Sequence, residues 1–124
     1  MTAAALLMLA LGVSPVTDGG TPGVESDAQA AVRFQISCDK GEAAGCIGLA
    51  TLAWQGRGVK ADPKRAFKLY LRACDLGDGS GCFSAAVCHR SGACAKKSAG
   101  AATKLFRRGC AAGDKRACGE VPKG

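Results

Sequence analysis

Apolar residues in the second half of this chain recur at i, i+3, i+4 and i+7, which is the spacing of one face of a helix. The same positions are small or apolar again 36 residues later. The two sets are Ala66, Leu69, Tyr70 and Ala73, followed by Ala102, Leu105, Phe106 and Gly109. Because the pattern returns at a fixed offset, it predicts an array of helix-turn-helix repeats.

Residues that begin and end helices keep the same register. Ser26, Asp62 and Ser98 are spaced by 36 residues and have side-chain oxygens that suit an N-cap position. Glycines suited to a left-handed helix end also recur, and in one set each glycine is followed by an acid that can cap the next helix. These glycines are Gly41, Gly77 and Gly113, with Gly56 and Gly92 as a further pair, and the acids are Glu42, Asp78 and Asp114.

These signals predict helices near residues 27–39, 43–55, 63–76, 79–90 and 99–112, with a short helix near 115–119. Short turns at the first set of glycines would make antiparallel hairpins. The predicted fold class is therefore all-α, an α/α solenoid of about two and a half 36-residue repeats.

Six of the eight cysteines follow the same period, as three pairs that are each eight residues apart. In each hairpin one sulfur lies a turn before a helix end and another just inside the next helix, so the two can meet across the contact. The predicted disulfides are Cys38 to Cys46, Cys74 to Cys82, Cys110 to Cys118 and, across a loop, Cys88 to Cys94. An even count at hairpin spacing favours disulfides over buried free thiols. Each disulfide that closes a nine-residue ring stabilises the folded state by about 2.5 kcal/mol. Two and a half repeats bury only a small hydrophobic core, so the fold needs this stabilisation.

Disulfides require an oxidising compartment, and the start of the chain is typical of an exported protein. Residues 3–13 form an apolar stretch with the length of a signal h-region, although no Lys or Arg precedes it. The stretch is too short for a transmembrane span. We expect a secreted or periplasmic protein with a signal-like segment and linker at 1–25, a repeat domain at 26–120 and a tail at 121–124.

Basic residues are concentrated in the repeats. Residues 1–30 contain three acids and no base, so the net charge of +7 leaves +10 on the rest of the chain. One helix face carries bases at i, i+4 and i+8, and two of these positions are basic again 36 residues later. The residues are Lys64, Lys68 and Arg72, then Lys104 and Arg108. This basic ridge favours an acidic partner, although most charged faces serve only solvation. Without interleaved aromatics it does not indicate specific nucleic-acid binding.

The stretch from Gly41 to Cys82 resembles the Sel1-like repeat, a relative of the tetratricopeptide repeat. The residues that carry the resemblance are Gly45-Cys46, Gly81-Cys82, Leu49, the GxGV turn from Gly56 to Val59, Asp62, Lys64 to Ala66 and the ACDLG run from Ala73 to Gly77. The cysteine-rich Hcp-like branch is the most similar. The second repeat departs at Cys94-Ala95, which replaces Gly58-Val59, so its loop is expected to differ in shape.

This resemblance implies a right-handed superhelix, linked by disulfides, that bacteria export for protein or cell-envelope interactions. Some Hcp-like proteins are also described as penicillin-binding proteins or weak β-lactamases. Ser37 and Lys40 have the S-x-x-K spacing of such enzymes, but no K-T-G or S-D-N follows. The register places Ser37 with Ala73 and Gly109 on the apolar face, so a packing role is favoured and a β-lactamase-like hydrolase is the alternative.

The other candidate functional residues indicate binding and not catalysis. Cys88, His89 and Cys94 lack a fourth ligand for zinc, and neither a metal nor a cofactor is expected. Trp54 is either packed against the next helix or an exposed aromatic anchor. Arg57, His89 and Arg90 would lie near it if the repeats stack as in relatives. We therefore expect a module that binds a protein, a peptide or an acidic cell-envelope component; the sequence does not predict its oligomeric state.

Overall fold

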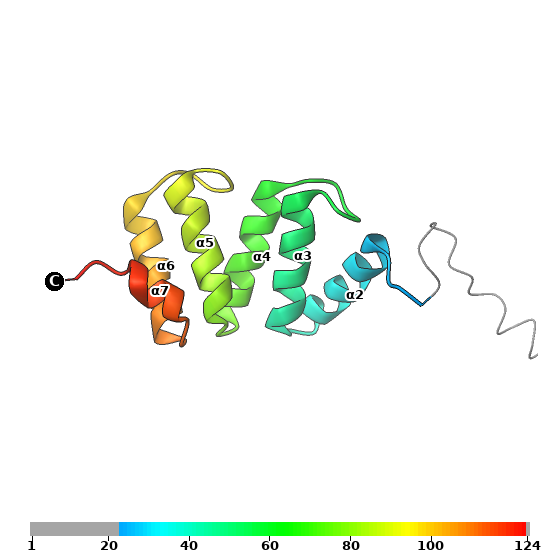
Figure 1. Cartoon of the computed structure of the whole chain (residues 1–124), viewed down its shortest axis with the longest axis horizontal. Coiled ribbons are helices and arrows are strands. Elements are labelled where there is room, and N and C mark those ends of the chain that lie inside the picture. Colours follow the sequence, from blue (N-terminus) through cyan, green and yellow to red (C-terminus); the bar gives the residue numbers. More distant parts are fainter. Residues whose placement is uncertain (1–22, 124) are drawn as a thin grey trace, which may run out of the picture.

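The computed structural model of the protein describes residues 23–123. Its helices stand side by side in a row, and each packs mainly against the next one along the chain (Figure 1). They are α2 (Asp27–Asp39), α3 (Ala43–Gln55), α4 (Pro63–Asp75), α5 (Gly79–Ser91), α6 (Ala99–Ala111) and α7 (Lys115–Glu120). This is the predicted all-α solenoid, and every helix boundary lies within one residue of its prediction. The apolar stretch at residues 3–13 lies outside the described residues.

Polar side chains begin the helices as predicted. Ser26, Asp62 and Ser98 each accept a hydrogen bond from the amide three residues further on, at 3.0 to 3.1 Å. Asp78 and Asp114 cap α5 and α7 in the same way. These bonds satisfy amides that have no partner inside the first turn.

The prediction of a cap at Glu42 was wrong. Glu42 stands at the N-cap position of α3, but its side chain makes no capping hydrogen bond. Capping favours the shorter side chains of Asp, Asn, Ser and Thr, whose oxygens lie close to the first amides. Helix α3 therefore begins without the side-chain cap that its counterparts in the other repeats have.

Connections of two kinds lie on opposite edges of the row (Figure 1). Short turns at Gly41, Gly77 and Gly113 occupy one edge, and these glycines have positive φ values of 88°, 96° and 96°. The loops 56–62 and 92–98 occupy the other edge. Each loop is closed by one amide-carbonyl bond, from Asp62 to Ala53 at 2.8 Å and from Ser98 to His89 at 2.9 Å.

The two loops differ in shape, as the sequence predicted. Gly58 has a φ of 71° and lies so close to the start of α2 that an added Cβ would be 2.7 Å from the Ala28 backbone nitrogen. Cys94 occupies the equivalent position in the second loop and has no positive φ. Its disulfide ties that loop to α5 instead.

Disulfides and small residues form most of the core. The cysteines pair as the sequence predicted, 38 to 46, 74 to 82, 88 to 94 and 110 to 118, with Cα separations of 4.4 to 4.9 Å. Alanine and cysteine dominate the buried residues, and the larger buried side chains are Leu49, Leu52, Leu105 and Phe106. Such a core buries little area for each residue, so the cross-links supply stability that packing does not.

Candidate functional site

Two hollows lie on either side of the loop 92–98, and Ala93 and Cys94 line both of them. One, of about 440 Å³, lies against Trp54 and is called the aromatic slot. The other, of about 710 Å³, lies against three lysines and is called the lysine cleft. The Cys88–Cys94 disulfide anchors the wall that separates them.

Consecutive repeats build the aromatic slot. Trp54 comes from the end of α3, Tyr70 from α4, and Phe83 and Val87 from α5, with Ser84 and Ser91 as polar members. Trp54 is exposed at 43% of its full surface, so of the two alternatives it is not the packed one. An apolar lining with a few hydroxyl groups suits an apolar side chain of a ligand.

The equivalent position one repeat later is closed. Arg90 stands 36 residues after Trp54, and Glu120 stands 36 residues after Ser84. Arg90 and Glu120 form an ion pair at 2.7 Å, and the Arg90 guanidinium lies 5.2 Å from the centre of the Phe106 ring. The chain thus covers this aromatic face with its own side chains and leaves the face beside Trp54 open.

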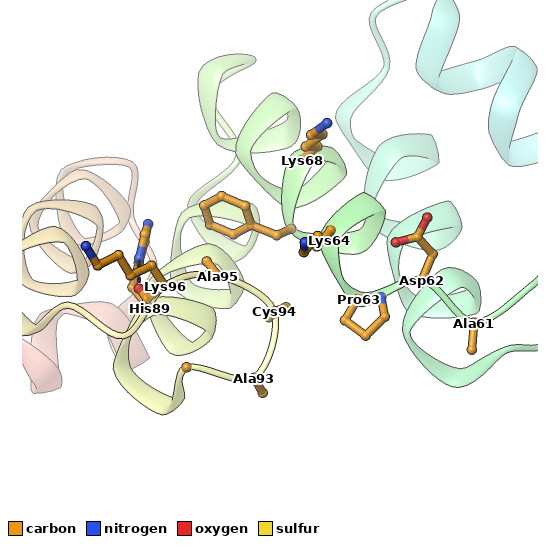
Figure 2. Close-up of a pocket in the computed structure, with 12 residues that line it drawn as sticks. Ala61, Asp62, Pro63, Lys64, Lys68, His89, Ala93, Cys94, Ala95 and Lys96 are labelled. Atoms are coloured by element: carbon orange, nitrogen blue, oxygen red, sulfur yellow. Dashed lines mark hydrogen bonds between the residues drawn. The ribbon is translucent and has the colours of Figure 1, made fainter.

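The lysine cleft lies between the start of α4 and the loop 92–98. Figure 2 shows Lys64 and Lys68 on α4, with Lys96 beside His89 on the opposite wall. The His89 ring packs edge-on against Phe67 at 5.0 Å, and its Nδ1 makes a hydrogen bond with the Lys96 carbonyl at 2.8 Å. These contacts fix the aromatic floor and the position of the loop beside the lysines.

Electrostatically the cleft is positive. None of Lys64, Lys68 and Lys96 forms an ion pair within the part of the chain that the structure describes. Asp62 is the one acid that lines the cleft, and its Oδ1 accepts the Arg65 backbone amide at 3.0 Å. The arrangement suits a ligand that carries negative charge.

The predicted basic ridge is divided between this cleft and an ion pair. Lys68 lines the cleft, whereas Arg108 pairs with Asp75 at 2.8 Å. Arg72 and Lys104 are exposed. Sequence reasoning missed Lys96 as a partner of Lys64 and Lys68; the basic pair Lys96-Lys97, two residues after the loop cysteine, was the available signal.

Comparison with known proteins shows the family. The Sel1 repeat model matches residues 43–78 and 79–114. The chain belongs to the Sel1 repeat family. Its structure is similar to Helicobacter pylori cysteine rich protein B, with 28% sequence identity and a TM-score of 0.71 over 73% of this chain and 68% of that one.

Two further solved structures share the fold of this Sel1 repeat protein. A Sel1 repeat protein from Oxalobacter formigenes is 19% identical with a TM-score of 0.74, and the match covers 79% of this chain and 40% of that one. The protective antigen c5321 of uropathogenic Escherichia coli is 22% identical with a TM-score of 0.69, over 74% of this chain and 20% of that one. This chain thus spans less than half the length of either protein. Comparison with curated proteins gave no match.

The four groove candidates of this Sel1 repeat protein do not lie in one groove. Trp54 lines the slot and His89 lines the cleft, on opposite sides of the loop. Arg57 forms a two-bond contact with Asp27 at 2.9 and 3.1 Å, and these bonds raise the pKa of Arg57. Arg90 is held by Glu120. Neither arginine lines the slot or the cleft.

Ser37 and Lys40, the weak catalytic candidates, lie at the end of α2. Ser37 is partly buried against Gly45, where an added Cβ would lie 2.5 Å from the Ser37 Cβ. Lys40 is exposed at the C-cap of α2, and its backbone amide donates hydrogen bonds to the Ile36 and Ser37 carbonyls. The close contact with Gly45 suits the packing role that the register favours for Ser37, and the hydrolase alternative stays a prediction.

The Sel1 repeats contain neither a metal cluster nor a membrane span within residues 23–123. No group of three potential metal ligands occurs there, and Cys88 and Cys94 are bonded to each other instead of flanking His89 as ligands. None of the helices in this range has the length and apolarity that a membrane crossing needs. The two hollows beside the loop 92–98 are the candidate sites because they gather aromatic and basic side chains from successive repeats.

Proposed function

We propose that this Sel1 repeat protein is an exported module that binds a segment of a partner protein at the aromatic slot, without turnover. Sel1 repeats generally mediate protein interactions. The observation that carries the proposal is Trp54, which is exposed in a slot beside Tyr70 and Phe83. Tryptophan and tyrosine are the residue types that dominate binding energy at protein interfaces.

The size and position of the slot support a peptide-sized ligand. Its volume of about 440 Å³ suits one or two side chains of a bound segment. It lies between helices of successive repeats, and the Cys74–Cys82 and Cys88–Cys94 disulfides fix α4, α5 and the loop that line it, so little ordering of these parts is needed when a ligand binds. A preformed site loses less free energy to ordering than a flexible one.

Export is supported by the four disulfides and by the likeness to a cysteine-rich relative. Disulfides persist in secreted and periplasmic proteins and are rare in the cytosol. Cells that produce the protein should be fractionated, and each fraction alkylated before and after reduction. We expect the protein outside the cytoplasm with no free thiol; reduced protein confined to the cytoplasm would contradict export.

The binding proposal is tested by closing the slot with the residue pair that closes the equivalent position one repeat later. Trp54→Arg with Ser84→Glu installs the Arg90 and Glu120 pair at the equivalent position and leaves the net charge unchanged. The matched control is Arg90→Ala with Glu120→Ala, which removes the natural pair outside the slot. Each protein is immobilised and incubated with cell-envelope extract under crosslinking, and bound proteins are identified by mass spectrometry.

We expect the wild type and the control to retain a protein that the slot-closing variant loses. Capture of the same proteins by all three would refute the role of the slot. Hydrolysis of a chromogenic β-lactam by the wild type, abolished in Ser37→Ala, would instead support the hydrolase alternative. Intrinsic fluorescence adds a direct readout, because Trp54 is the single tryptophan in the chain and its emission reports on the slot.

A further inference from the structure

We propose that the lysine cleft is a second binding site, which takes the carboxylates of an acidic peptide segment. This inference goes beyond the proposed function, because it concerns the opposite side of the loop 92–98 and different residues. It depends on the charge, the shape and the lining of the cleft.

The three lysines of the cleft outnumber its one acid, Asp62, and are not paired with it. Lys64, Lys68 and Lys96 come from two walls of one hollow, and none of them is within ion-pair distance of an acid among residues 23–123. The carboxylate of Asp62 is engaged by a backbone amide. By contrast Arg108, outside the cleft, is paired with Asp75. A ligand carboxylate would supply the counter-charge that the cleft lacks.

The shape of the cleft favours a peptide over a membrane. The lysines surround a hollow of about 710 Å³, and a hollow admits side chains but not the surface of a bilayer. Pockets for ligands of this size bury most of the ligand surface. An acidic segment can place its carboxylates between opposing lysines, whereas lipid headgroups would meet only the rim.

The lining of the cleft supports the same ligand. Phe67, Pro63 and Ala95 give it an apolar floor beside the lysines. The Phe67 and His89 rings pack edge-on against each other and are not parallel platforms for nucleobases. The floor can therefore accept the aliphatic stems of glutamate side chains while the lysines bind their carboxylates.

The experiment measures binding of an acetylated hexaglutamate peptide with a neutral fluorophore, by anisotropy at low and at physiological salt. The cleft variant is Lys64→Gln, Lys68→Gln and Lys96→Gln. The control, Lys104→Gln, Arg107→Gln and Lys115→Gln, removes the same charge from exposed positions outside the cleft. Thermal unfolding of each variant verifies that it is folded.

We expect the cleft variant to lose about tenfold in affinity and the control less than about twofold, with weaker binding at higher salt. Equal losses in the two variants would show that only the overall charge matters and would overturn the proposal. Binding of phosphatidylglycerol vesicles without binding of hexaglutamate would overturn it in favour of a membrane surface. The slot-closing variant should bind hexaglutamate as the wild type does, so failure of one proposed site is distinguishable from failure of the other.

Discussion

Gly81 of α5 packs directly against Ala73 of α4, because a Cβ built on the glycine would lie 2.7 Å from the Ala73 Cβ. The other hairpins have equivalent pairs, Ser37 with Gly45 and Gly109 with Ala117. Each pair adjoins a disulfide whose Cα atoms are only 4.4 to 4.5 Å apart. Each of these three disulfide-linked hairpins therefore places a glycine at a close contact between its helices.

Gly81→Ala should destabilise the protein. The added methyl would also lie 2.8 Å from the Cys74 backbone nitrogen, which the adjacent disulfide prevents from moving away. We expect a loss of about 2 kcal/mol in the free energy of unfolding, in the range of other overpacked sites. Guanidinium unfolding followed by circular dichroism measures it.

Gly100→Ala is the matched control for Gly81→Ala. Gly100 lies in the first turn of α6 with nothing within 4 Å of an added Cβ. Replacing a helical glycine by alanine at an open position stabilises by up to about 1 kcal/mol. If both variants shifted stability in the same direction, the close contact at Gly81 would not be what selects glycine there.

Replacement by alanine should cost more stability at Asp78 than at Glu42, although both residues stand at the same position of the repeat. Asp78 accepts the Ser80 amide at 2.8 Å, whereas Glu42 makes no capping bond. Asp78→Ala should therefore cost about 1 kcal/mol and Glu42→Ala less than about 0.5 kcal/mol. Urea unfolding midpoints compare them, and equal losses would contradict the assigned caps.

Most of the fold is predictable from the sequence because the residues that signal helix ends act on their own helix or turn. Caps such as Asp62 and left-handed glycines such as Gly77 act on their own helix or turn, so their spacing defines the helices directly. The same register places the sulfurs of Cys74 and Cys82 on facing turns. A period in the sequence therefore predicts the helices and the disulfides together.

The sites depend on contacts that a period does not encode. Lys96 joins Lys64 because the loop 92–98 is tied back to α5 by the Cys88–Cys94 bridge and by hydrogen bonds to His89. Arg57 and Arg90 do not line the expected groove, and each pairs with an acid 30 residues away in the chain. Such side-chain contacts do not follow the 36-residue repeat, so the slot and the cleft are visible only in the three-dimensional structure.

Removal of the Cys88–Cys94 bridge should weaken both proposed sites. Cys94 lines the slot and the cleft, and its bridge anchors their shared wall to α5. Replacing both cysteines by alanine should lower stability by about 2 to 3 kcal/mol and reduce both hexaglutamate binding and capture at the slot.

The bridge between Cys110 and Cys118 provides the comparison, since neither cysteine lines the slot or the cleft. Replacing these two by alanine should cost similar stability but leave binding at both sites near the wild-type value. Anisotropy titrations and thermal unfolding on the same preparations distinguish the two effects. Unchanged binding after removal of the Cys88–Cys94 bridge would show that the loop keeps its shape without it.

Acid should destabilise the C-terminal helix through Asp114. The Arg116 side chain hydrogen-bonds Asp114 at 2.9 Å and lowers the pKa of that carboxyl below its ordinary value, and the Ala117 amide lowers this pKa further. A carboxyl whose pKa is lower in the folded state stabilises the fold above its unfolded pKa of about 4. That contribution disappears as the pH falls through the lowered folded value.

The unfolding free energy of the wild type should therefore fall more steeply between about pH 5 and pH 2 than that of Asp114→Asn. Asparagine keeps the capping oxygen but does not ionise, so the variant isolates the charge from the cap. Arg116→Gln removes the first cause of the pKa shift and should flatten the same slope. Urea midpoints at several pH values measure all three proteins, and parallel curves would show that the Asp114 and Arg116 pair does not contribute to acid sensitivity.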